Sequence, residues 1–209
     1  MVMDIHIHTK VGSGDSSIDP DSLIEEARRK GLDGICITEH GVKKPFWAFE
    51  LGEREGFLVI GGMEVGTELG DLLIFGVDEV PRSLYRAREL CSYVKAKGGV
   101  IIAAHPFRVY FTWRSWIKRS ITLEKALSWE LFDLVDAMEV ANGWATDEEV
   151  KFSMEVASRL RIPGTGGSDA HSIGDVGSCV TVFENEIKNE EDFLREILMG
   201  KFRAEDRRR

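Results

Sequence analysis

Short apolar segments alternate with amphipathic segments along most of this chain. Segments typical of buried strands lie at residues 3–8, 34–38, 57–60, 72–77, 100–103, 137–140, 163–166 and 179–183. Between them, apolar residues at helical spacing predict helices at 20–30, 84–94, 122–130, 150–160 and 190–199. Most of the strands are apolar throughout, which predicts an α/β protein with a parallel sheet covered by helices. This pattern does not distinguish an open sheet from a barrel.

The polar positions at the ends of these strands add a second signal. All five histidines lie at the C-terminal end of a predicted strand or in the turn after it, namely His6, His8, His40, His105 and His171. Parallel α/β folds build their sites at that edge of the sheet. Five scattered histidines would not be expected to gather there by chance, so we expect them to share one site.

The first strand carries three of the polar residues at alternate positions. Asp4, His6 and His8 share one face of the strand, while Ile5 and Ile7 face the helical layer. Two imidazoles at this spacing can bind one metal ion, and Asp4 could orient a ligand from behind. The alternative is a polar face on an edge strand.

Other strand ends carry carboxylates beside the remaining histidines. Asp169 and His171 follow a glycine-rich turn, Glu39 precedes His40, and Glu64 follows Gly61-Gly62. Grouped carboxylates and histidines desolvate or repel one another unless cations compensate. Two or three divalent metals would do so, and they would also generate hydroxide near neutral pH and stabilise a phosphoryl transition state. The sequence has no GxSxG, P-loop or Rossmann glycine pattern that would favour another chemistry.

Composition narrows the class of protein. The 209 residues suffice for one domain, which we expect to consist of a barrel over about 1–185 and a C-terminal helix with a frayed basic tail over 186–209. A formal net charge of −9 argues against stable binding of duplex nucleic acid, but not against a nucleotide substrate. No segment is typical of a membrane span or secretory signal, which predicts a cytoplasmic protein. The three separated cysteines predict buried free thiols.

The order of motifs resembles the PHP (polymerase and histidinol phosphatase) family. The motifs are DIHIHT, TEH, GGMEVGTELGDLLIFG, AAHP, MEVANG and GGSDAH, and they extend from Asp4 to His171. Six ordered motifs are far more specific than any one of them. The resemblance implies a distorted (β/α)7 barrel with up to three metal ions at its C-terminal mouth.

Metal ligands follow from the resemblance, position by position. His6 and His8 would bind a first metal, Glu64 would bridge the first and second, and His105 would bind the second. His40 and His171 would bind a third, with Asp169 near the first or third. Glu64, Asp169 and His105 are the residues predicted to carry catalysis. The metals would be two or three ions of Mn, Zn, Fe or Mg.

Two further ligands are predicted at positions that depart from the family pattern. Asp15 lies in the loop that often supplies a His or Asp to the third metal, although its spacing from His8 is one residue longer than usual. Asp71 stands where many members have a histidine after the bridging glutamate. A carboxylate there would favour Mn or Mg over Zn. The alternative is that Asp71 is only a turn residue.

Substrate groups are predicted in two loops. Arg108 is placed to pair with a phosphate oxygen, or else is a surface arginine, and Asn142 is a second candidate. The aromatic segment from Phe107 to Trp116 could stack on a substrate ring as a lid, or could be buried or form a dimer contact. Asn142 and Trp144 leave the same choice open.

The predicted function is hydrolysis of a phosphoester by metal-activated hydroxide at a di- or trinuclear site. The substrate would be a small phosphorylated metabolite, a nucleotide or the end of an oligonucleotide. One alternative is an accessory PHP domain of a larger assembly, and another is a metal-dependent hydrolase of a non-phosphate bond. The sequence leaves the substrate and the oligomeric state open.

Overall fold

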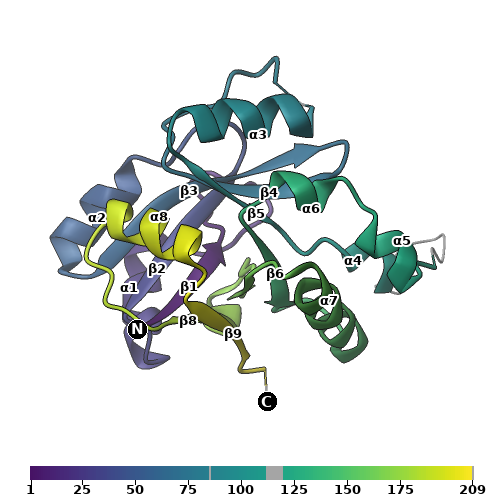
Figure 1. Ribbon diagram of the computed structural model, residues 1–209. Coiled ribbons are helices and arrows are strands. Elements are labelled where there is room, and N and C mark those ends of the chain that lie inside the picture. The colour runs from purple at the N-terminus through teal and green to yellow at the C-terminus, as the bar shows by residue number, and fades with distance from the viewer. Residues whose placement is uncertain (85, 112–119, 209) are drawn as a thin grey trace.

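A nine-stranded mixed sheet forms the centre of the molecule, with strand order β7-β6-β5-β4-β3-β2-β1-β8-β9 (Figure 1). The computed structural model describes residues 1–84, 86–111 and 120–208. The strands are β1 Val2–Ile7, β2 Gly34–His40, β3 Leu58–Thr67, β4 Gly70–Phe75, β5 Val100–Ala103, β6 Ala137–Asn142, β7 Gly164–Gly167, β8 Cys179–Phe183 and β9 Phe202–Asp206.

The helices lie outside this sheet, with α2 and α7 on opposite sides of it (Figure 1). Their bounds are α1 Pro20–Arg29, α2 Trp47–Glu55, α3 Ala87–Ala96, α4 Arg108–Phe111, α5 Leu123–Leu127, α6 Leu131–Leu134, α7 Asp147–Leu160 and α8 Glu190–Met199. The sequence patterns did not reveal α2. They also joined α5 and the turn before α6 into one longer helix.

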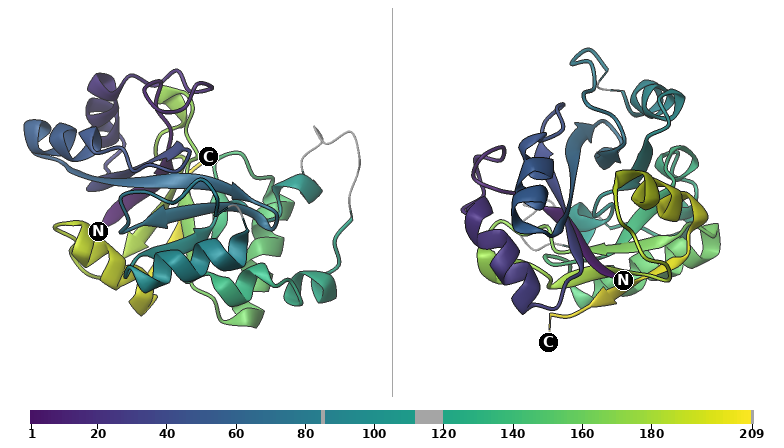
Figure 2. Two further views of the ribbon diagram at one scale, coloured as in Figure 1. Left: turned by 90° about the horizontal axis from the view of Figure 1, so that it is seen from above. Right: turned by 90° about the vertical axis from the view of Figure 1, so that its left-hand side faces the viewer.

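The sheet curves until β7 returns to β1, which gives the barrel shape visible from two further directions (Figure 2). The amide of Asp169 donates to the carbonyl of His6 at 2.8 Å, and the amide of His8 donates to the carbonyl of Ala170 at 3.0 Å. These bonds bring the segment after β7 beside the end of β1. The predicted distorted α/β barrel is confirmed.

The expected parallel pairing is wrong for β4 and β8, and the sequence patterns did not predict β9. Strand β4 pairs antiparallel with both β3 and β5, and β8 pairs antiparallel with β1 and β9. The β3–β4 turn is a tight hairpin in which Gly70 has φ 126° and the Thr67 hydroxyl donates to the Gly70 carbonyl at 2.6 Å. A hairpin needs only a short turn, whereas a parallel crossover needs a dozen residues or more.

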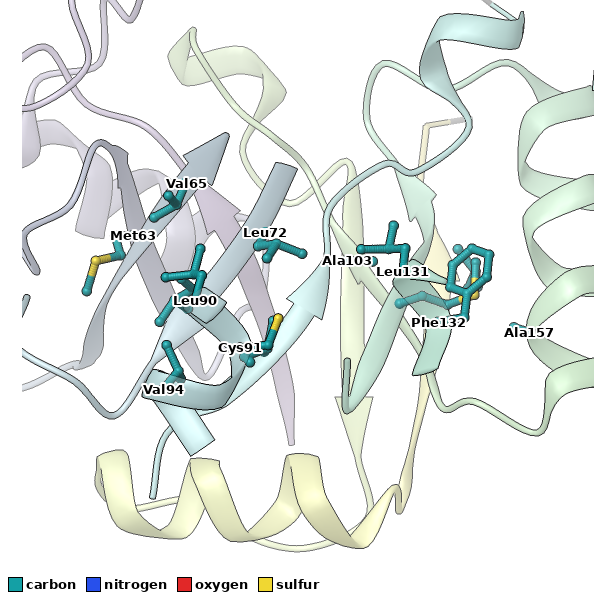
Figure 3. Packing of buried hydrophobic residues seen from close by; sticks show 14 of the residues in the cluster. Met63, Val65, Leu72, Leu90, Cys91, Val94, Ala103, Leu131, Phe132 and Ala157 are labelled. Atoms are coloured by element: carbon teal, nitrogen blue, oxygen red, sulfur yellow. The ribbon is translucent and has the colours of Figure 1, made fainter. Parts of the chain in front are cut away.

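Helix α1 forms for the local reasons that its sequence indicates. The Asp19 side chain accepts the amide of Asp21, Pro20 occupies the first turn, and Leu23, Ile24 and Ala27 are buried. A cluster of buried hydrophobic side chains joins strands β3–β6 to α3 and α6. Leu90, Cys91 and Phe132 are among its members (Figure 3). Cys36, Cys91 and Cys179 are all buried and free, as predicted.

Helix α8 covers the barrel end where the parallel strands begin. Phe193 and Ile197 pack against Met3, Phe75 and Phe183, all buried. The histidines lie at the opposite end, because they stand at or just after the C-terminal ends of β1, β2, β5 and β7. The site and this apolar closure therefore occupy opposite ends of the barrel.

The C-terminal segment is not the frayed tail expected from the sequence. Gly200 ends α8 in a left-handed conformation, and β9 then pairs with β8 along five residues. The amide of Arg207 donates to the Ser178 carbonyl at 2.8 Å, and the Arg208 guanidinium pairs with Asp206. None of the helices in the described ranges is long and apolar enough to cross a membrane.

Candidate metal centre

Histidines and carboxylates from six strand ends surround a cavity of about 210 Å³ at the C-terminal mouth. Its lining comprises Asp15, His40, Glu64, Gly66, Asp71, His105, Arg108, Asp169 and His171. A larger groove of about 1360 Å³ lies between α2 and residues 184–191, and no histidine lines it. The chemistry is therefore concentrated at the smaller cavity.

The innermost group comprises His6, His8, Glu64 and Asp169, whose ligand atoms all lie within 4.8 Å of one another. The two Nε2 atoms of the histidines are 3.0 Å apart, and His8 Nε2 lies 3.2 Å from both Glu64 Oε2 and Asp169 Oδ1. All four residues are buried. Two imidazole lone pairs and two carboxylates that converge at this separation suit a divalent cation.

Glu64 also belongs to a second group, with Asp71 and His105. Its other oxygen, Oε1, lies 2.9 Å from His105 Nε2. Asp71 is exposed and sits opposite Gly66 in the β3–β4 hairpin. The hairpin thus brings Asp71 to the cavity wall, beside the carboxylate that serves both groups.

A third group comprises His8, His40 and His171. Asp15 Oδ2 lies 3.4 Å from Nε2 of both His40 and His171. His40 reaches back to the inner group, with its Nδ1 3.0 Å from Glu64 Oε2, because His40 and Glu64 are neighbours on β2 and β3. Asp15 therefore lies beside His40 and His171, the two histidines predicted to bind a third metal.

The charges of the innermost group affect one another's pKa values strongly. Burial would raise the pKa of Glu64, but the nearby His6 and hydrogen bonds from His105 and His40 hold that pKa well below its usual range. Asp169 behaves in the same way, with its pKa lowered chiefly by His6 and His8 against the effect of burial. Conversely, although burial lowers it, Asp169, Glu139 and Glu64 raise the pKa of His6 well above its ordinary value.

Glu139 holds His6 from behind, and the sequence analysis did not assign it a role. Its Oε1 lies 3.1 Å from His6 Nδ1, and its Oε2 accepts from the His105 amide and the Asn142 side chain, both at 2.9 Å. With the Nδ1 proton donated to this carboxylate, His6 Nε2 is left facing the group. The available signal was an acidic residue between apolar neighbours in the middle of a buried strand.

Glu39 performs the corresponding task for His8, through Ser13. The Ser13 hydroxyl donates to Glu39 Oε2 at 2.6 Å, and the same Ser13 oxygen lies 3.1 Å from His8 Nδ1. Since the serine proton is engaged with Glu39, its oxygen accepts from His8 Nδ1–H and leaves Nε2 bare. Gly12 is required here, because a Cβ would lie 2.5 Å from the Glu39 side chain.

Asp4 was expected to orient a ligand from behind, and its carboxylate contacts backbone amides rather than a histidine ring. Its carboxylate accepts from the amides of Ser168 at 2.9 Å and Gly177 at 2.8 Å. It therefore holds the loop that carries Asp169. In that loop Asp169 has φ 53°, and His105 on the next wall has φ 28°. Strained backbone of this kind in non-glycine residues clusters at functional sites.

The two predicted substrate residues lie together, but only one of them faces the cavity. Arg108 Nη2 donates to Asp169 Oδ2 at 2.5 Å and to Asn142 Oδ1 at 2.7 Å. Asn142 is buried, and its amide group is occupied by Arg108 and Glu139. Asn142 thus positions Arg108 rather than lining the cavity.

The aromatic segment after His105 is largely part of the core where it is described. Phe107 is fully buried against Trp129, Phe132 and Phe152. Tyr110 and Phe111 are partly buried in the same cluster, so these three residues do not form a lid. The other two aromatics predicted for it, Trp113 and Trp116, lie outside the described residues.

Comparison with known proteins identifies the family. The model of the PHP domain matches residues 4–120, which is more than half of the chain, and that of the PHP-associated region matches residues 148–202. The chain therefore belongs to the PHP family, as its motifs indicated. This membership, together with the cluster of histidines and carboxylates, confirms the prediction of a metal-dependent hydrolase of the PHP type.

Two relatives are similar to this chain over different shares of their length. Uncharacterized protein MJ1587 of Methanocaldococcus jannaschii is 30% identical over 159 residues, which are 70% of this chain and 85% of that protein. The phosphoribosyl 1,2-cyclic phosphate 1,2-diphosphodiesterase of Eggerthella lenta is 33% identical over 68 residues, or 32% of this chain and 25% of that enzyme.

A solved structure from Bacteroides vulgatus has the same fold. It is a two-domain protein containing a predicted PHP-like metal-dependent phosphoesterase, and it superposes with a TM-score of 0.70 at 19% identity. The match covers 99% of this chain and 64% of that protein. At this identity the likeness shows the fold alone.

Proposed function

We propose that this protein hydrolyses a phosphoester of a small molecule, a nucleotide or an oligonucleotide end at a site that binds two or three divalent cations. The arrangement of Glu64 carries this proposal. Its two oxygens face different groups, with Oε2 toward His8 and Oε1 toward His105. A carboxylate shared in this way is typical of centres with two adjacent cations, which clamp a phosphate during displacement.

The ligand sets follow from the three groups. We assign the first cation to His6, His8, Glu64 and Asp169, and the second to Glu64, Asp71 and His105. The third would be held by His40 and His171 with Asp15. The second group offers two carboxylates and one imidazole, and that donor set favours Mn or Mg over Zn.

Each part of the site has a role in hydrolysis. The bound cations would lower the pKa of a water molecule and neutralise charge on the phosphoryl group. Arg108 lies at the cavity wall, where its Nη2 donates to Asp169 and Asn142, and its guanidinium would pair with phosphate oxygens of a bound substrate. Glu139 and Ser13 hold the Nδ1 protons of His6 and His8, so that both Nε2 atoms stay directed into the cavity.

One relative supports a phosphate ester as the substrate. The Eggerthella lenta relative is a phosphoribosyl 1,2-cyclic phosphate 1,2-diphosphodiesterase. An accessory domain without catalysis is less well supported, because every histidine and carboxylate predicted as a ligand lies in one of the groups or beside it.

The test is turnover of an aryl phosphate by metal-stripped protein after reloading with Mn, Zn, Fe or Mg. We expect restored turnover that His6→Ala and Asp169→Ala both abolish. Glu155→Ala, an exposed carboxylate on α7, is the matched control and should retain full activity. Absence of turnover with every metal and several phosphoesters would contradict the proposal, whereas turnover that survives both ligand substitutions would contradict the site assignment.

A further inference from the structure

Trp144 lies beside the metal centre with half of its surface exposed to solvent. Its indole Nε1 donates to the carbonyl of Asp169 at 2.9 Å, and its backbone amide donates to Asn142 Oδ1 at 2.9 Å. The polar edge of the indole is therefore used inside the protein. What remains exposed is the apolar ring, held in a fixed orientation.

The loop that carries Trp144 is packed against a neighbouring loop through backbone contacts. The amide of Gly143 donates to the Gly167 carbonyl at 3.2 Å, and a Cβ on Gly143 would lie 2.2 Å from the carbonyl oxygen of Ser168. The β6–α7 loop is thus packed directly on the loop that carries Asp169. Thr146 then caps α7 by accepting the amide of Glu149 at 3.1 Å. A ring on such a support is preorganised for contact.

The backbone of Trp144 and the group proposed to bind phosphate share one hydrogen-bond acceptor. A single oxygen, Asn142 Oδ1, accepts hydrogen bonds both from the Trp144 amide and from Arg108 Nη2. Other apolar side chains in the loops at this end of the barrel are also exposed, namely Val109 after Arg108 and Ile173 after His171. Scattered exposed apolar residues are ordinary on a protein surface. Trp144 differs because its exposed ring is anchored to the backbone of a proposed metal ligand.

We propose that the exposed face of Trp144 stacks on a planar ring of the substrate, and that this ring is the nucleobase of a nucleotide whose phosphate lies at Arg108. This inference rests on the proposed phosphoesterase function and narrows its substrate class to nucleotides. Base stacking on an aromatic side chain tolerates every base and does not depend on positive charge. It therefore suits a chain with a net charge of −9, whose surface does not attract nucleic acid by charge alone.

The test compares substrates that differ only in the ring. A nucleoside 5′-monophosphate and ribose 5-phosphate share the sugar phosphate, and the ratio of their kcat/KM values measures the contribution of the base. For Trp144→Ala we expect this ratio to fall about ten-fold or more, mainly through KM of the nucleotide. Trp144→Phe, which lacks the indole N–H but keeps a ring, should retain most of the ratio.

Controls distinguish stacking of the Trp144 ring on the base from the hydrogen bond by which Trp144 holds Asp169. Both substitutions remove the bond to the Asp169 carbonyl, so any effect of that loss appears equally with both substrates. Phe49→Ala removes another exposed aromatic ring, on α2, and should leave the ratio unchanged. A binding readout without turnover is the quenching of tryptophan fluorescence by a nucleoside monophosphate. We expect stronger quenching in the wild type than in Trp144→Phe, which keeps the other four tryptophans.

The outcomes are distinguishable. Equal losses with both substrates in Trp144→Ala, or quenching as strong in Trp144→Phe as in the wild type, would overturn the stacking proposal while leaving phosphoester hydrolysis intact. Failure of the wild type on the aryl phosphate as well would instead overturn the proposed function. A dinucleotide with a 5′-phosphate, tested beside the mononucleotide, shows whether the base belongs to a free nucleotide or to a strand end. The Trp144-dependent preference should appear with at least one of the two.

Discussion

The inner and outer parts of the metal centre differ in how their histidines are held. His6 and His8 are fully buried. His6 Nδ1 contacts the buried carboxylate of Glu139, and His8 Nδ1 contacts Ser13, which donates to the buried carboxylate of Glu39. In the third group, which is the outer part of the centre, the side chains of His40 and Asp15 are 44% and 61% exposed. Burial with fixed hydrogen bonds preorganises the inner ligands, whereas the outer ligands must be ordered when a cation binds.

This difference indicates that the inner and outer positions of the centre bind cations with unequal affinity. Hydrogen bonds hold the inner ligands in place before a cation binds. When the cation binds, it replaces the protons on the histidines and reduces the repulsion between the carboxylates. The outer ligands have solvent as an alternative partner, so less free energy is gained when they bind. We therefore expect the outer position to exchange its cation more readily than the inner positions.

The largest effect is expected for Glu64→Ala, which removes the residue shared by the two inner groups. Loss of a residue on which the whole centre depends should lower kcat/KM by roughly a thousand-fold or more. The metal content per chain, measured by elemental analysis, should fall by more than one ion. Retention of the full metal content would show that Glu64 does not bridge.

A smaller loss is expected for the residues behind the inner histidines. Glu139→Gln replaces the acceptor of the His6 Nδ1 proton with an amide, and should weaken inner metal binding about 10- to 100-fold. Titration of the metal-stripped protein with Mn measures this. Glu184→Gln, remote from the centre in the larger groove, is the control. If Glu139→Gln weakened metal binding equally at the outer position, the inner and outer parts of the centre would not be independent.

The pH dependence should be steepest at the inner group. The pKa of His6 is raised well above its ordinary value by Asp169, Glu139 and Glu64, despite burial. A proton therefore competes with the cation, and metal affinity should rise with pH until the raised pKa is passed. Binding titrations over a pH series, with proton release measured in parallel, test this. An affinity independent of pH would contradict it.

The same shift predicts the stability of the metal-stripped protein. Because the folded pKa of His6 is raised, the pairing of His6 with its carboxylates stabilises the fold fully below the unfolded pKa of about 6.5, and this contribution is lost as pH rises through the folded value. Removal of metal should therefore lower Tm more at high pH than at low pH, by several degrees. Thermal melts with and without a chelator measure the difference.

The smallest effect is expected in the outer group. Asp15→Asn keeps the shape of a mostly exposed side chain and removes its charge, so activity should fall by less than about ten-fold. Added metal should restore it, because a weakened exposed site can still be filled by mass action. A loss as large as that of Glu64→Ala would show that the outer position is part of the catalytic core.

Local features of the sequence determined much of this protein. Strand periodicity placed His6 and His8 on one side of β1, and Asp19 with Pro20 marked the start of α1, because neighbours along the chain decide both. The position of the histidines after strand ends was sufficient to predict a shared site, since parallel strands present their C-terminal ends at one edge. The order of motifs then supplied the barrel.

Only the tertiary structure decided the rest. The hairpin that makes β4 antiparallel, the pairing of β9 with β8, and the closure of β7 on β1 depend on contacts between distant segments, which local periodicity does not encode. Glu139 and Glu39 could not be assigned their tasks until the fold set them behind His6 and His8. Trp144 acquired its position in the same way, because its indole is anchored to Asp169 from another strand end.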